Sequence, residues 1–160
     1  WAAALFDDAA ALGLPVSTDL HDWDGSNPYY HPFAWRADLV FLSAAVLGEG
    51  VFEAMRAIVR DGRAQVVVAT DGARGSHALA RGDDTIRHAG CAALDGPVVD
   101  SNGAGDAFSS AFLHAWFGGA TLEACMRSGA IGGAYACRFH GTAERSLGLE
   151  ELAQYWHGAR

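Results

Sequence analysis

The stretch Gln65-Val66-Val67-Val68-Ala69-Thr70 is the part of the sequence that most directly sets the fold. The run is continuous and rich in β-branched residues, a composition typical of a strand that is covered on both faces of a parallel sheet. The turn Asp71-Gly72-Ala73-Arg74-Gly75 follows it directly. We therefore predict a buried central strand that ends in a glycine-rich turn.

Shorter elements precede this strand. In chain order, the residue pattern predicts a helix that ends at Gly13, a strand over 16–20, a polar aromatic loop over 21–35, a strand over 38–42 and a helix over 52–60. The acidic residues Asp19, Asp22 and Asp24 are interpreted as part of a solvated loop. The loop's aromatic side chains either flank a sugar or a base or pack with one another.

Helices dominate the sequence after the strand. The pattern predicts short strands near 76–80 and 85–88, long helices over 104–117 and 121–139, and a short helix over 149–156. In the second long helix, Gly129, Gly132 and Gly133 form a face of small residues that lets a neighbour approach closely. The alternation of strands and helices indicates one α/β domain over residues 1–160, with a mostly parallel sheet flanked by helices.

The composition excludes several classes of function. The chain of 160 residues carries a formal net charge of -8, and all eleven of its basic residues are Arg. A chain without Lys has neither a Walker A Lys nor a Schiff-base nucleophile, and its acidity argues against binding to nucleic acid. No apolar run approaches the roughly 18 residues of a membrane span. We therefore expect a cytoplasmic protein with neither nucleic acid nor membrane as a partner.

The cysteines and the first residue carry two further expectations. Cys91, Cys125 and Cys137 form no CxxC pair, so reduced thiols are expected. The chain begins with Trp1, and residues 2–13 look like the middle of a fold. We therefore expect it to be part of a longer protein.

A second glycine-rich turn carries the chemistry. The run Asp100-Ser101-Asn102-Gly103-Ala104-Gly105-Asp106 stands directly before an apolar helix. Its glycines let the backbone approach an oxyanion, and the unpaired amides and dipole of the first helical turn favour negative charge there. Asp106 lies at the mouth of this anion site, where a carboxylate can accept the proton of an attacking hydroxyl. An Asp at a helix N-terminus is also often only a cap, and the residues alone leave both interpretations open.

The wider pattern resembles the pfkB family of sugar and nucleoside kinases, whose fold is ribokinase-like. Residues 100–108 match the family signature Asp-Thr-x-Gly-Ala-Gly-Asp-x-Phe, with Ser101 in place of Thr. Residues 70–75 are similar to the family's Thr-x-Gly-x-x-Gly turn, and Gly141-Thr142 stands where the family often has Gly-Ala. The resemblance implies that the chain is the carboxy-terminal, nucleotide-binding and catalytic half of a larger carbohydrate kinase.

The resemblance also implies roles for individual residues. Asp106 would be the general base on the acceptor hydroxyl, and the turn from Gly103 through Ala104 and Gly105 would form an anion hole for the γ-phosphate. The residues that would border the nucleotide are Thr70, Gly72 and Gly75, with Ser128 or Gly129 near the adenine.

The resemblance further implies the partners. ATP would be the co-substrate, Mg²⁺ would accompany it, and a monovalent cation is compatible with the family. The acceptor would be a small-molecule sugar or nucleoside. A homodimer is one expected arrangement, because the family's lid strands often form that contact.

Two positions depart from the family pattern. Members often follow the second strand with Asn-x-x-Glu, which helps hold magnesium-bound water, and the matching positions here are Ser43 and Val46. Glu49 lies close by, and a solvent-facing Glu at a helix start is its simpler interpretation. The alternative function is therefore a nucleotide- or sugar-binding relative with impaired catalysis. A dinucleotide-dependent oxidoreductase fits poorly, because no GxGxxG follows a strand with an acidic residue about 20 positions on.

Overall fold

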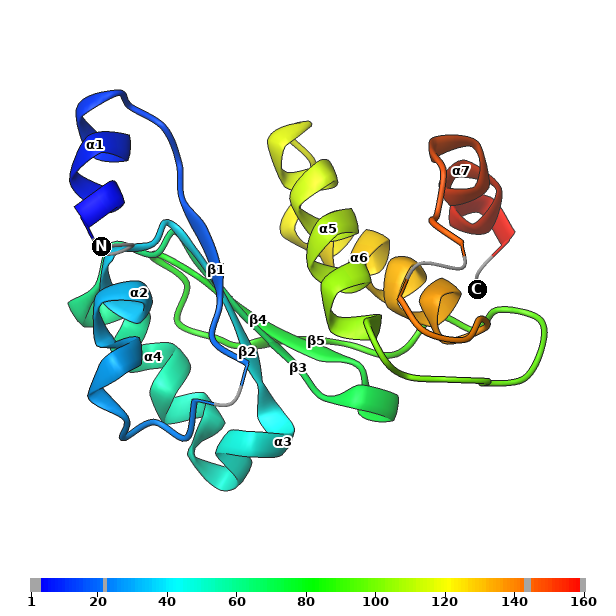
Figure 1. Ribbon diagram of the computed structural model, residues 1–160, viewed down its shortest axis with the longest axis horizontal. Coiled ribbons are helices and arrows are strands. Elements are labelled where there is room, and N and C mark those ends of the chain that lie inside the picture. The colour runs from blue at the N-terminus through cyan, green and yellow to red at the C-terminus, as the bar shows by residue number, and fades with distance from the viewer. Residues whose placement is uncertain (1–3, 22, 143–144, 159–160) are drawn as a thin grey trace. The chain divides into compact units, whose positions relative to one another are not determined.

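The computed structural model describes residues 4–21, 23–142 and 145–158, which form two compact units (Figure 1). Unit 1 comprises Trp1–Gly72 and His77–His88, and unit 2 comprises Ala73–Ser76 and Ala89–Arg160. The expectation of a single domain stays a prediction. No helix among the described residues combines the length and the apolar character needed to cross a membrane.

A five-stranded sheet has the order β1-β2-β3-β4-β5. β1 pairs with β2 and β2 with β3 in parallel, and Val40 lies opposite Val67. β4 runs antiparallel to β3, because the amide of Arg81 donates to the carbonyl of Gln65 at 2.8 Å and the connection over 71–75 is too short for a parallel crossover. The strands are β1 (Ser17–Asp19), β2 (Leu39–Ser43), β3 (Val66–Thr70), β4 (Ser76–Ala80) and β5 (Arg87–Ala89).

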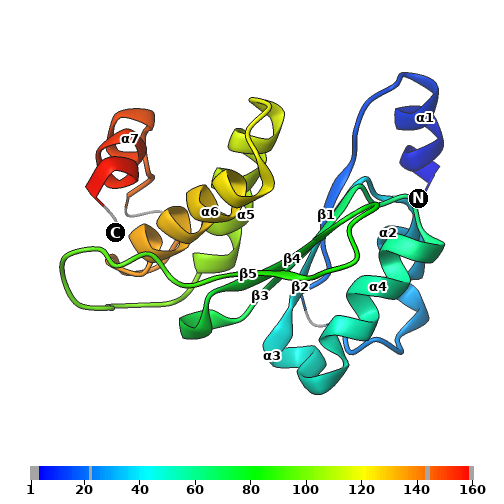
Figure 2. The ribbon, with the colours of Figure 1, turned by 180° about the vertical axis from the view of Figure 1, so that it is seen from behind.

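The predicted α/β architecture with a mostly parallel sheet is confirmed, and so is its buried central strand. Val66, Val67, Val68 and Ala69 of β3 are all fully buried. Figure 2 shows α2 (His31–Arg36) and α4 (Val51–Asp61) beside the sheet, where Met55 and Ile58 of α4 join the same core cluster as Val67. Burying a side chain of this size contributes about 1.5–3 kcal/mol, so this layer holds unit 1 together.

The prediction of a loop over 21–35 is wrong at its carboxy-terminal end. The structure has a 3₁₀ turn, η2 (Pro28–Tyr30), that continues into α2. Pro28 and Pro32 each stand in the first turn of a helical element, where a missing amide hydrogen costs nothing. The prolines therefore start these elements, whereas the sequence pattern had suggested that they interrupt the chain.

The aromatic side chains of this segment pack with one another. Trp23 meets Trp35 edge to face at a centroid distance of 5.8 Å. Phe33 lies 5.7 Å from Tyr29 and 5.9 Å from Phe6 of α1 (Leu5–Ala11). Packing among these side chains is therefore observed, and their role toward a sugar or a base stays a prediction.

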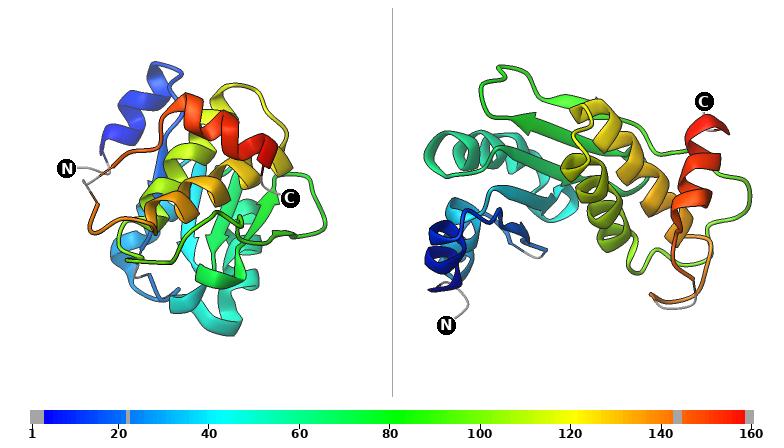
Figure 3. Two further views of the ribbon diagram at one scale, coloured as in Figure 1. Left: turned by 90° about the vertical axis from the view of Figure 1, so that its right-hand side faces the viewer. Right: turned by 90° about the horizontal axis from the view of Figure 1, so that it is seen from above.

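Unit 2 is built on two helices that approach each other closely, α5 (Ala104–Phe117) and α6 (Leu122–Ala136) (Figure 3). A Cβ added at Gly132 would lie 2.6 Å from the carbonyl oxygen of Ala107, and one at Gly129 would lie 2.8 Å from the ring of Phe108. The predicted face of small residues is therefore confirmed as the contact with α5. Thr121 caps α6, because its hydroxyl accepts the Ala124 amide at 3.3 Å.

The remaining short elements complete the chain. They are α3 (Ala44–Leu47), η3 (Gly48–Gly50), η4 (Gly72–Arg74) and α7 (Leu149–Gly158).

Candidate active site

The turn before α5 presents unused backbone amides. Gly103 is the N-cap residue, has a left-handed backbone with φ of 75°, and offers no side chain to cap the helix. The Ala104 amide donates to the Ser101 carbonyl at 3.2 Å. Among the residues that the structure describes, no acceptor is found for the amides of Gly105 and Asp106. These two amides, together with the helix dipole, can bind an anion.

Asp100 fixes the shape of this turn. Its carboxylate accepts the amides of Asn102 and Gly141, each at 2.9 Å, and so ties the turn to the chain that follows α6. The Asn102 amide and then the Gly141 amide hold the pKa of Asp100 below its ordinary value. The Val99 amide adds a bond of 2.7 Å to the carbonyl of Cys137 at the end of α6. The turn is therefore held by contacts that are distant in sequence.

Gly103 could not be another residue without strain. A Cβ there would lie 2.7 Å from Cγ2 of Thr142, and its positive φ disfavours any side chain. Gly105, two positions along, has open space where a Cβ would be. The first glycine is thus required by the backbone, and the second leaves the approach to the amides open.

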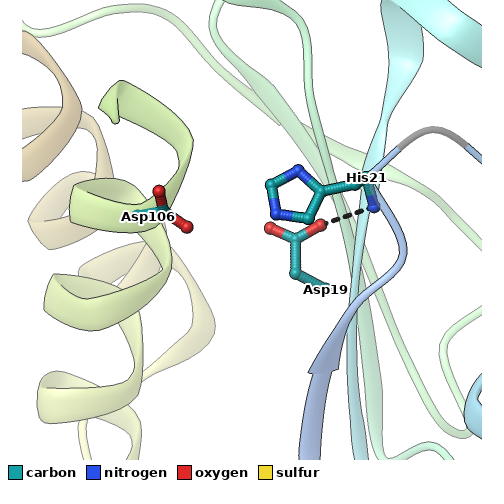
Figure 4. A group of neighbouring side chains, drawn as sticks. All are labelled: Asp19, His21 and Asp106. Carbon is teal, nitrogen blue, oxygen red and sulfur yellow. Dashed lines mark hydrogen bonds between the residues drawn. The ribbon is translucent and has the colours of Figure 1, made fainter. Parts of the chain in front are cut away.

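Asp106 stands on the first turn of α5, where Figure 4 shows its carboxylate projecting from the helix. The side chain is exposed and borders a cavity of about 440 Å³ that lies wholly within unit 2. The polar side chains that line this cavity are those of Asn102, Asp106, Ser110, His114, Tyr135, Thr142, Arg145 and Ser146.

Glu151 of α7 secures the wall of the cavity opposite α5. Its carboxylate accepts the Gly148 amide at 3.0 Å and the hydroxyl of buried Tyr135 at 2.9 Å, and it lies 3.7 Å from the guanidinium of Arg145. The Gly148 amide, followed by the Tyr135 hydroxyl, lowers the pKa of Glu151. The segment over 145–148 is thereby anchored to both α6 and α7.

The other predicted nucleotide residues have the following positions. Thr70 ends β3, and its hydroxyl donates to the Leu42 carbonyl at 3.3 Å. Gly72 and Gly75 both have positive φ, and a Cβ at Gly75 would lie 2.0 Å from the Ala89 carbonyl oxygen, so this glycine is needed where the chain passes β5. Their role toward a nucleotide stays a prediction.

On α6, the two candidates for an adenine contact differ. Ser128 is buried and borders a second hollow of about 420 Å³, whose walls include His114 and Trp156. Gly129 faces the ring of Phe108 at contact distance. The geometry therefore gives Gly129 a packing contact with α5, while Ser128 stays a candidate for binding.

The positions that depart from the family pattern lie at the end of β2. Ser43 is the N-cap residue of α3 without a side-chain cap bond, and Val46 is 43% exposed. Glu49 is exposed on η3.

The acidic residues before η2 serve the local backbone. Asp19 accepts the amide of His21, which has a positive φ (Figure 4), and Asp24 accepts the amides of Ser26 and Asn27. Asp22 lies outside the described residues.

Sequence reasoning missed the cavity wall. Ser110 and His114 follow Asp106 at intervals of four residues, a spacing that places all three on one face of α5. That signal was present in the sequence. Arg145 carried no such signal, because its place depends on contacts with Glu151.

Comparison with known proteins gives consistent matches. The profile of the family described as pfkB family carbohydrate kinase matches residues 41–147. The chain is 50% identical over 138 residues to the acarbose 7(IV)-phosphotransferase of an Actinoplanes species, a match that covers 86% of this chain and 46% of that protein.

Two solved structures are similar as well. The microbiome-derived acarbose kinase Mak1 superposes with a TM-score of 0.90 at 41% identity, covering 98% of this chain and 53% of that one. A ribokinase of Arabidopsis thaliana gives a TM-score of 0.81 at 20% identity, covering 96% of this chain and 51% of that one, and shares the fold. The chain spans about half the length of these relatives.

Proposed function

The chain belongs to the pfkB family of carbohydrate kinases, and on that premise we propose that the protein transfers the γ-phosphate of ATP to a hydroxyl of a sugar or a related small molecule. The observation that carries the proposal is the turn before α5. In this turn, the amides of Gly105 and Asp106 have no acceptor among the described residues, and the exposed carboxylate of Asp106 borders a cavity.

Asp106 is the general base in this proposal. Its carboxylate accepts the proton of the acceptor hydroxyl as that oxygen attacks the γ-phosphorus in line. The amides of Gly105 and Asp106 donate to the oxygens of the transferring group, where negative charge is spread. Since the turn is already fixed by Asp100, these donors need little rearrangement during the reaction.

The positions that match the family's Asn-x-x-Glu pair suit magnesium only in part. Ser43 offers one hydroxyl and Val46 offers no ligand atom, so this pair would hold little of the ion. The phosphates of the nucleotide and water would supply the other ligands, as is usual for Mg²⁺. When bound, the ion neutralises charge on the phosphates.

The acceptor is proposed to be acarbose or a similar carbohydrate. Two of the most similar proteins, at 50% and 41% identity, are named for acarbose. A nucleoside acceptor has less support, because neither of these relatives is named for one.

The test compares Asp106→Asn with Asp8→Asn. Asp8 stands in the first turn of α1 and is exposed, so it matches Asp106 as a helix-start carboxylate outside the proposed site. Loss of the general base should lower kcat by about 10²–10⁴-fold and leave ATP affinity unchanged, whereas Asp8→Asn should retain full turnover. Near-normal turnover in Asp106→Asn would return Asp106 to the role of a helix-dipole partner.

A relative with impaired catalysis is the second candidate, and Ser43 and Val46 favour it. In that case the protein binds ATP or a sugar in titrations but transfers no phosphate across a carbohydrate panel. Replacing both residues, Ser43→Asn with Val46→Glu, would then raise turnover.

A further inference from the structure

Two histidines of unit 1 stand side by side on neighbouring strands. β4 and β5 are adjacent in the sheet, and the connection over 81–86 is too short for a parallel crossover, so the two strands run antiparallel. His77 lies on β4 and His88 on β5, and their ring centroids are 4.9 Å apart with the ring planes tilted by 41°. The two imidazoles are therefore in contact across the strands.

The neighbours of the two histidines show which face of the sheet they share. Leu79, two residues after His77, belongs to the core cluster that includes residues of α4. Ile86, two residues before His88, packs against the same cluster. Because side chains two residues apart in a strand point to the same side, both imidazoles lie on the face that α4 covers. His88 is exposed and His77 is half-buried, so solvent reaches the pair.

The ring of Phe52 orients His77. Phe52 is in the first turn of α4, and its ring meets the His77 imidazole edge to face at a centroid distance of 5.0 Å and an angle of 80°. A side chain that is held by such packing loses less conformational freedom when it binds a ligand. His77 is therefore partly preorganised, while the exposed His88 can adjust to it.

The spacing of the two rings fits a shared metal ion. Imidazole nitrogens bind Zn²⁺ at about 2.0–2.1 Å, so two imidazoles on one tetrahedral ion have ring centroids roughly 5 Å apart. The observed 4.9 Å agrees with this separation. Imidazole is a preferred ligand of Zn²⁺, Ni²⁺ and Cu²⁺, whereas Mg²⁺ and Ca²⁺ prefer oxygen. Among the described residues, no group of three or more ligand residues includes this pair, so water would fill the other positions around the ion.

We propose that His77 and His88 bind a divalent transition-metal ion of the zinc type, which joins β5 to β4. β5 has three residues and is the last strand in the order of the described sheet. An ion held by one ligand from each strand keeps this short strand against its neighbour. It takes no part in phosphoryl transfer, so the proposal is independent of the proposed function.

The first measurement is a calorimetric titration with Zn²⁺ alone. It uses the full-length protein, freed of metal with a chelator and without nucleotide. The variants are His77→Ala and His88→Ala, and the second of these changes an exposed side chain and leaves the core intact. His31→Ala is the matched control, because His31 is an exposed histidine of unit 1 whose ring partner is Trp35 at 5.2 Å. Mg²⁺ is the control ion.

The second measurement is hydrogen exchange of the amides of β4 and β5, which reports on this site even if Zn²⁺ also binds elsewhere. Since the ion binds only while the two strands are paired, free Zn²⁺ at 100 times its Kd should slow exchange through their separation by about 100-fold. The slowing should disappear in His88→Ala and persist in His31→Ala.

The expected result depends on both histidines. Each single variant should weaken Zn²⁺ binding at this site by at least about 10- to 100-fold, because even the loss of an outer-shell partner of a metal ligand costs that much. His31→Ala should match the wild type, and Mg²⁺ should neither bind at the pair nor slow exchange. Unchanged Zn²⁺ affinity in His88→Ala, or a loss in only one of the two variants, would show that the pair does not chelate an ion. An equal loss in His31→Ala, or equal slowing by Mg²⁺, would reveal non-specific binding and overturn the proposal.

Discussion

Replacing Gly103 with Ala should damage the turn in two separable ways. The left-handed backbone, with φ of 75°, costs a residue that has a Cβ about 1–2 kcal/mol. The new Cβ would also lie 2.7 Å from Cγ2 of Thr142, well inside contact distance. Since Thr142 is exposed and can yield, we place this overlap at the lower end of the overpacking range, about 1 kcal/mol. The total expected loss of stability is therefore about 2–3 kcal/mol.

A double-mutant cycle separates the two contributions. Thr142→Ser removes Cγ2 and should relieve the overlap while leaving the backbone strain. Gly103→Ala should then cost only about 1–2 kcal/mol in the Thr142→Ser background, which corresponds to a coupling energy of about 1 kcal/mol. Gly105→Ala is the control from the same turn. Nothing lies near its added Cβ, and it should be neutral or stabilising by up to about 1 kcal/mol.

Urea unfolding followed by tryptophan fluorescence measures these free energies, because Trp116 on α5 and Trp156 on α7 report on unit 2. An equal cost of Gly103→Ala in both backgrounds would show that Thr142 does not limit the site. A cost below about 0.5 kcal/mol would show that residue 103 does not need a left-handed backbone, and the account of the turn would fail.

Two further predictions concern the contacts that hold the turn and the helix pair. Because the Asn102 and Gly141 amides lower the pKa of Asp100, its stabilising effect is present above the unfolded pKa of about 3.9 and is lost as pH falls through the lower folded value. Asp100→Asn should therefore be less stable than wild type in urea at pH 7, and the difference should narrow below about pH 4; a gap that does not change with pH would contradict this. Gly132→Ala should destabilise by about 1–3 kcal/mol or more, because its Cβ would meet the Ala107 backbone, whereas Gly90→Ala, with open space around it, should leave the melting temperature unchanged.

Much of the fold could be predicted because its signals are local. β3 is a continuous run of apolar residues, and such a run remains recognisable without knowledge of its neighbours. The face of small residues on α6 was likewise predicted from the spacing of its glycines. Only the structure shows that α5 fills the space beside them. The segment before β2 was misassigned because a proline has opposite meanings inside a helix and in its first turn.

In the candidate site, too, the features that depend on neighbouring residues were predictable and those that depend on distant contacts were not. An anion site at a helix start depends on a few consecutive residues, so the sequence predicted it. The bond from the Gly141 amide to Asp100 joins residues 41 positions apart, and no pattern in the sequence encodes it. The far wall of the cavity also depends on Arg145 and Glu151, which meet only because α7 packs on α6.

The structure also bears on which aspartate of the Asp100 to Asp106 run is the better candidate for catalysis. On sequence alone, a capping role remained open for Asp106. Asp100 accepts two backbone amides, which hold it ionised and in place, so its lone pairs serve the turn. For Asp106 the described residues provide no amide donor within its own turn, and its carboxylate borders the cavity. A carboxylate without a structural partner can accept a proton without disrupting the helix start, and this supports the proposal that Asp106 is the base and Asp100 its support.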